Sequence, residues 1–116
     1  MLAPILMLVM AAQTTPADPR DRGSALFNNC QINVKMTPED TLPNYQAAAA
    51  CTAYIDGYTD GIETGKYFCV GGATLGTLAR VYVAYMEKHP KLMDIYKSEV
   101  LFLALLESYP CPIKKK

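Results

Sequence analysis

Apolar residues recur every three or four positions through much of the chain, and this spacing predicts amphipathic helices. A first helix is expected over residues 22–32 and a second over residues 44–65. Asn44 is a suitable N-cap for the second helix, and Gly65 is a suitable C-terminal stop. Five apolar residues at helical spacing are predicted to form its buried face: Ala47, Cys51, Tyr54, Tyr58 and Ile62.

The second half of the chain predicts two more helices. Thr74 is the expected N-cap of a third helix, which ends near Lys88. Its apolar stripe is expected to contain Leu75, Leu78, either Val81 or Tyr82, and Tyr85. Pro90 suits the first turn of a fourth helix over residues 90–108. Residues 100–106 are apolar without interruption, so this helix is either central in the fold or in contact with a second subunit.

The segments outside the helices set the boundaries of the domain. Residues 1–12 are apolar, too few to span a membrane, and typical of the apolar part of a signal peptide. A disordered apolar N-terminus is the alternative. The rest divides into a lead-in expected to be disordered, one helical domain and a basic tail, over residues 13–21, 22–112 and 113–116. A connector over residues 34–43 is expected to hold a short helical turn closed by Pro43.

No strand-like alternation competes with these helices, so the sequence predicts an all-α fold, a small four-helix antiparallel bundle stapled by two disulfides. Behind an export signal, four cysteines are expected to pair in an oxidising compartment. In this topology the first helix ends where the second begins, which brings Cys30 near Cys51. The second and fourth helices end at the opposite pole, which brings Cys69 near Cys111. Of the three possible pairings, this one is favoured.

Few residues are available for catalysis or metal binding. The one histidine, His89, lacks other ligands around it in the sequence, and paired cysteines leave no free thiol. Asp56, Asp60 and Glu63 are expected to form a solvated acidic face. The 11 basic and 11 acidic residues balance, so nothing favours nucleic acid as a partner. We therefore expect no catalytic site, no metal site and no cofactor.

A protein partner matches the exposed chemistry better. Tyrosine is common in protein interfaces, and Tyr67 and Phe68 lie in a loop flanked by glycines. Packing of Phe68 over the nearby disulfide is the alternative. The expected contact residues are those of this loop and the lysines near the break after the third helix: Tyr67, Phe68, Gly71, Gly72, Lys88 and Lys91.

Several short motifs occur in a characteristic order. They are Cys51-Thr52-Ala53-Tyr54-Ile55-Asp56-Gly57, then Phe68-Cys69, then His89-Pro90, then Tyr109-Pro110-Cys111. In this order and spacing, residues 23–111 resemble the Tai family of type VI secretion amidase immunity proteins and the related Rap (resistance-associated) proteins. Family members often have a proline shortly after the cysteine that matches Cys69. This chain has Val70-Gly71-Gly72 there, so a more mobile loop is expected at this departure from the family.

The resemblance implies a small, disulfide-stapled, periplasmic protein that is commonly a homodimer. Its partner would be a peptidoglycan amidase effector, a papain-like cysteine peptidase that the protein binds and blocks. The resemblance implies that the protein is not itself an enzyme and that the mature chain has no integral membrane segment.

Two other functions are alternatives to this one. The apolar residues 100–106 and a possible dimer interface would also suit a periplasmic stress chaperone of the small helical acid-chaperone kind. A small disulfide-rich lipase would need a histidine–aspartate pair on a helix, whereas His89 precedes a proline.

Overall fold

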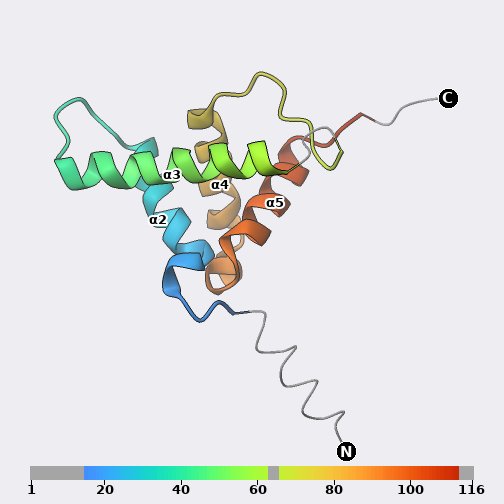
Figure 1. Ribbon diagram of the computed structural model, residues 1–116, viewed down its shortest axis with the longest axis horizontal. Coiled ribbons are helices and arrows are strands. Elements are labelled where there is room, and N and C mark those ends of the chain that lie inside the picture. Colours follow the sequence, from blue (N-terminus) through green and yellow to red (C-terminus); the bar gives the residue numbers. More distant parts are fainter. Residues whose placement is uncertain (1–14, 63–65, 113–116) are drawn as a thin grey trace, which may run out of the picture.

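The computed structural model describes residues 15–62 and 66–112 of the protein. Within these residues the chain forms four α-helices and two short 3-10 helices, and its two β-bridges are isolated pairs. In chain order the elements are η1 (Pro19–Asp21), α2 (Gly23–Val34), α3 (Leu42–Gly61), α4 (Leu75–Lys88), η2 (Pro90–Asp94) and α5 (Lys97–Ser108). The all-α fold class is therefore confirmed (Figure 1).

Helix α2 is the central element of the fold. It contacts η1, α3, α4, η2 and α5, and α3 lies across the other helices in Figure 1. Gly23, the first residue of α2, permits close packing: a Cβ there would lie 2.8 Å from Met86 Cε and 2.9 Å from the Leu92 carbonyl oxygen. The buried Tyr82 hydroxyl donates a hydrogen bond to the Gly23 carbonyl oxygen at 2.8 Å. These contacts join α2 to α4 and η2.

The buried faces of the helices differ in part from those expected. In α3 the buried residues are Ala48, Cys51 and Ile55, while Tyr54 and Tyr58 are only partly buried. The buried face of α3 therefore includes Ala48 and Ile55 rather than the two tyrosines. In α4 the buried residues include Leu78, Ala79, Tyr82, Val83 and Met86, so Tyr82 rather than Val81 belongs to the buried stripe.

Helix α5 explains the uninterrupted apolar run. Val100, Leu101, Ala104 and Leu105 are buried in the core, whereas Leu103 and Leu106 are each 39% exposed. The helix therefore buries one broad face and leaves a narrower apolar face on the surface. No helix among the described residues is long and apolar enough to cross a membrane.

The start of α3 corrects the expected boundary. The N-cap is Thr41, whose hydroxyl accepts a hydrogen bond from the Asn44 amide at 3.4 Å. Pro43 lies in the first turn of the helix, where its missing N–H costs nothing, so it does not close the connector. At the other end α3 stops at Gly61 because Ile62 has an extended backbone. Gly65, the expected stop, lies outside the described residues.

The expected fourth helix is divided. Residues Pro90–Asp94 form η2, and α5 begins only at Lys97. Between them Ile95 is extended, its carbonyl oxygen accepts a hydrogen bond from the Gly23 amide at 2.7 Å, and Tyr96 forms a bridge with Arg22. Tertiary backbone pairing with the start of α2 therefore interrupts the helix, and no residue type in the sequence signals this. In contrast, Thr74 caps α4 as expected.

The described part of the lead-in has local structure. Asp18 caps η1, and the Arg22 guanidinium donates a hydrogen bond to the carbonyl oxygen of Pro16, which is buried. From Thr15 onward this segment is therefore more ordered than its composition suggested. The proposed signal peptide and the basic tail lie outside the described residues.

Both disulfides pair as expected from the helix order. Cys30 on α2 is joined to Cys51 on α3, and Cys69 is joined to Cys111 beyond the end of α5. The chain contains no other cysteine. The sequence separations are 21 and 42 residues, and closing loops of this size contributes about 3–4 kcal/mol each in the chain-entropy account.

Candidate functional site

An apolar surface covers the outer side of α5 and the loop before α4. Tyr67 is 45% exposed, Leu103 and Leu106 are each 39% exposed, and the Tyr67 ring meets the Phe102 ring edge-on with 5.6 Å between centroids. Tyr58 of α3 lines an open groove of about 430 Å³ together with Phe102 and Leu103. We call the set Tyr58, Tyr67, Phe102, Leu103 and Leu106 the Tyr67–α5 surface.

The positions on α5 explain why this surface is continuous. Leu103 and Leu106 are three residues apart, and Phe102 and Leu106 are four apart, so their side chains are neighbours on the helix. Ser98 and Glu99 complete the groove on its polar side. An apolar centre with a polar edge is the usual composition of a protein interface.

The two aromatic residues expected in the contact loop differ in their surroundings. Tyr67 is exposed as expected, but Phe68 is 0% exposed, packs edge-on to Phe102 and belongs to the core. The structure therefore corrects the expectation that Phe68 offers its ring to a partner. Its backbone pairs with Pro110, beside the Cys69–Cys111 disulfide.

The other expected contact residues do not form one site with each other. Gly71 and Gly72 are exposed ahead of α4, and Gly71 has a φ of +59°, a conformation that favours glycine. Lys88 and Lys91 are exposed at the far end of α4. A helix of this length spans about 20 Å, so the glycines and the lysines belong to different parts of the surface.

A second exposed apolar region was missed from the sequence. Leu42 is 69% exposed and Tyr45 is 43% exposed at the start of α3. Figure 1 shows this end of α3, with the connector that precedes it, away from α4 and α5. We call residues 36–45 the connector tip. The sequence signal for this region is an apolar residue, Leu42, directly before a proline that suits the first turn of a helix.

Hydrogen bonds hold the connector tip in place. The Asp40 carboxylate accepts hydrogen bonds from the Thr37 amide at 2.8 Å and from the Asn44 side-chain amide at 2.8 Å. The Tyr45 hydroxyl donates to the Pro38 carbonyl oxygen at 2.9 Å. The bond from Asn44, with that from Thr37, holds the pKa of Asp40 below its usual range. The expected helical turn is a single turn, closed by the Asp40 amide on the Thr37 carbonyl oxygen.

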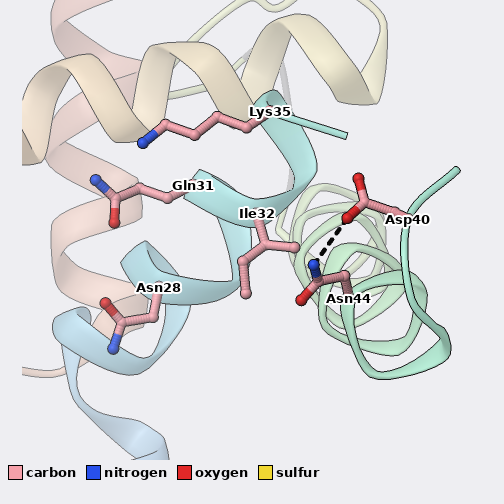
Figure 2. A pocket seen from close by; sticks show the side chains of 6 residues that line it. All are labelled: Asn28, Gln31, Ile32, Lys35, Asp40 and Asn44. Carbon is pink, nitrogen blue, oxygen red and sulfur yellow. Dashed lines mark hydrogen bonds between the residues drawn. The ribbon is translucent and has the colours of Figure 1, made fainter. Parts of the chain in front are cut away.

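A groove of about 430 Å³ separates the connector tip from α2. Most of the residues that line it are polar, although the surface they present to it is mainly apolar: Asn28, Gln31, Ile32, Lys35, Asp40 and Asn44. Figure 2 shows Asn28, Gln31 and Lys35 on successive turns of α2, and Asp40 hydrogen-bonded to Asn44 on the other side of Ile32. Asp40 is therefore engaged within the protein, and its role here is to brace the connector.

The titratable groups considered for catalysis lie in different surroundings. The His89 ring packs against Tyr85, with 4.3 Å between centroids. Asp56 and Asp60 are exposed on α3, as expected for a solvated face, and Glu63 lies outside the described residues. Burial raises the pKa of Tyr58 to about 12. Among the residues that the structure describes, no group of three or more histidine, cysteine or acidic side chains could hold a metal ion.

Comparison with known proteins gives one match. Residues 22–111 match the family model of Rap1a immunity proteins. This range includes both disulfides, all four described α-helices and the Tyr67–α5 surface. The chain matches no curated protein and no solved structure.

Proposed function

Because the chain belongs to the family of Rap1a immunity proteins, we propose that it binds and sterically blocks a peptidoglycan amidase delivered by a type VI secretion system. The observation that carries this proposal is the family match over residues 22–111, which spans the whole helical domain. We propose that the partner is a papain-like cysteine peptidase and that the protein itself is not an enzyme.

The Tyr67–α5 surface is the proposed contact with the effector. Tyr67 and Phe102 offer aromatic area close to two exposed leucines, and tyrosine is enriched among residues that dominate binding energies. The surface lies on a helix and on a loop tied down by a disulfide, so little conformational freedom is lost on binding. Inhibition would follow from covering the cleft of the effector, without any reaction of the inhibitor.

The proposed location is the periplasm. All four cysteines are paired, and disulfides persist in oxidising compartments such as the bacterial periplasm. A cell-wall amidase also acts in that compartment, so inhibitor and effector would meet there. The proposed signal peptide over residues 1–12 would provide the export.

We also propose that the protein is a homodimer. The connector tip is a second exposed apolar region, and it lies away from α5 in Figure 1. A second copy bound there would leave the Tyr67–α5 surface free. The protein therefore has separate surfaces for its own copy and for the effector.

Affinity capture with matched variants tests the effector contact. Oxidised mature protein, used as bait on envelope and secreted fractions at neutral pH, is expected to retain a peptidoglycan amidase in stoichiometric amount. The double variant Leu103→Ser/Leu106→Ser is expected to retain at least about tenfold less, since truncating central apolar contacts typically costs about 1–2 kcal/mol each.

The control for this experiment is Leu42→Ser, which makes the same chemical change on the connector tip. It is expected to capture the amidase as the unmodified protein does. Thermal unfolding followed by circular dichroism checks that all baits are folded. Equal capture by all three baits would remove the Tyr67–α5 surface from the account, and capture of no amidase by the unmodified bait would contradict the proposed function.

A further inference from the structure

The two disulfides lie in different environments. Cys30 and Cys51 are both 0% exposed and belong to the hydrophobic core. Cys69 and Cys111 are partly exposed and lie outside the buried core. Because a thiolate must reach a sulfur atom to reduce a disulfide, the rate of reduction depends on access. The Cys69–Cys111 bond therefore lies closer to solvent in the folded protein than the Cys30–Cys51 bond, which is enclosed by the core.

The partly exposed Cys69–Cys111 disulfide holds the loop that carries Tyr67. It joins the segment before α4 to the segment after α5 across 42 residues. Beside it, the Cys69 amide donates a hydrogen bond to the Tyr109 carbonyl oxygen at 2.8 Å, and Phe68 pairs with Pro110. Over residues 66–73 the other backbone hydrogen bond that the structure describes is local, from Ala73 to the Val70 carbonyl oxygen at 3.2 Å.

Contacts other than the Cys69–Cys111 disulfide hold the helical core together. Helix α2 is tied to α3 by the buried Cys30–Cys51 bond. It is tied to α4 by the hydrogen bond from Tyr82 to Gly23 and by the packing of Met86 and Val100 around Gly23. None of these contacts involves residues 66–74 or 109–112, so they do not depend directly on the second disulfide. From the loop itself, Phe68 is also buried in the core, against Phe102.

We propose that the Cys69–Cys111 disulfide is a reducible clamp, which a dithiol reductant opens selectively to release the Tyr67 loop while the helical core stays folded. Reduction of the disulfide consumes two electrons. A thiolate of the reductant attacks one sulfur, the other sulfur leaves as a thiolate, and the second thiol of the reductant resolves the mixed disulfide. The products are two protein thiols, at Cys69 and Cys111, and the oxidised reductant as its own disulfide.

Release of the clamp would regulate the proposed interface. Without the cross-link, the backbone pairing of residues 68–69 with residues 109–110 has to persist unaided, and the Tyr67 ring loses its fixed position against Phe102. The expected loss of effector affinity rests on the proposed function. The selective opening does not, because it is a property of the isolated protein and is measured without the effector.

Limited reduction of the folded, oxidised protein tests the clamp. The protein is treated with increasing dithiothreitol at neutral pH, alkylated, digested and analysed by mass spectrometry. Cys69 and Cys111 are expected to be reduced at least about tenfold faster than Cys30 and Cys51. Hydrogen exchange of the Cys69 amide is expected to accelerate at least about tenfold after selective reduction, while the Ile55 amide in α3 keeps its protection.

A matched pair of double variants provides the controls. Cys69→Ala/Cys111→Ala is expected to show fast exchange at position 69 with or without dithiothreitol, and Cys30→Ala/Cys51→Ala is expected to keep the clamp. Should either variant fail to fold, the reduction series on the unmodified protein still decides. Reduction of both disulfides at one rate, or unchanged exchange of the Cys69 amide after selective reduction, would overturn the proposal. Unclamped protein that binds an amidase with full affinity would refute only the regulation of the interface.

Discussion

Single residues decide how closely the helices of this protein pack, and Gly23 is the clearest case. Its position at the start of α2 brings the backbone within reach of Met86 on α4, Leu92 on η2 and Val100 on α5. Any Cβ there would meet a backbone carbonyl oxygen, which cannot move as a flexible side chain can. The glycine is therefore a requirement of packing and not of backbone conformation.

A pair of glycine-to-alanine changes tests this interpretation. Gly23→Ala is expected to lower the free energy of unfolding by about 1–3 kcal/mol, because it overpacks a filled site. Gly57→Ala is expected to raise it by about 0.5–1 kcal/mol, because Gly57 is an exposed helical position with nothing within 4 Å of an added Cβ. Urea unfolding of both variants measures the two effects, and a stabilising Gly23→Ala would show that the junction of α2, α4 and η2 is not tightly packed.

The sequence predicts some of these residue roles and not others. The role of Thr74 as an N-cap could be predicted because a cap depends on local sequence. The exposure of Leu42 could not, and the burial of Phe68 was one of two alternatives, because both residues lie next to turn residues where no helical periodicity applies. For such residues, exposure depends on which distant element covers them, as Phe102 covers Phe68.

At the scale of elements, the helices follow the apolar spacing and their ends follow tertiary contacts. The number and order of the four α-helices agree with the sequence prediction. The break between η2 and α5 does not, because it depends on a backbone hydrogen bond from Gly23 to Ile95, which is distant in the sequence. The connector tip likewise acquires its shape from the bonds of Asp40 to Thr37 and Asn44.

A substitution in the connector tip tests its proposed role as the dimer contact. If it is the dimer contact, Leu42→Ser should shift the protein toward the monomer, since Leu42 is the most exposed of the large apolar residues described. Sedimentation velocity of the oxidised protein at several concentrations measures the change, which we expect to be at least about tenfold in the dissociation constant. Leu103→Ser is the matched control on α5. If Leu103→Ser weakens the dimer and Leu42→Ser does not, the dimer contact is the Tyr67–α5 surface and not the connector tip.

At the scale of the whole molecule, the order of the helices predicted which cysteines pair, although not the place of each one. Cys30 is joined to Cys51 in the middle of α3 and not at its start, and Cys69 before α4 is joined to Cys111 after α5. The proposed binding surface was less predictable. The sequence identified Tyr67, but the leucines that complete the surface belong to a run of residues that looked uniformly apolar, and only the packing of α5 separates Leu103 and Leu106 from their buried neighbours.

The whole molecule combines a stable core with two exposed apolar regions. A helical core with one buried disulfide carries both regions, and a second, partly exposed disulfide joins the loop of one of them to the end of the chain. The chain belongs to the family of Rap1a immunity proteins, and this arrangement would provide what the proposed steric inhibitor needs: a stable body and a surface that is already in place before binding.

The most direct test of the central claim is inhibition of the amidase captured by this protein. Hydrolysis of purified peptidoglycan by that amidase is followed while the oxidised mature protein is added in increasing amounts at neutral pH. We expect activity to fall to near zero at one inhibitor chain per amidase. Undiminished hydrolysis in the presence of excess inhibitor would contradict the account, because binding that leaves the cleft of the enzyme open confers no immunity.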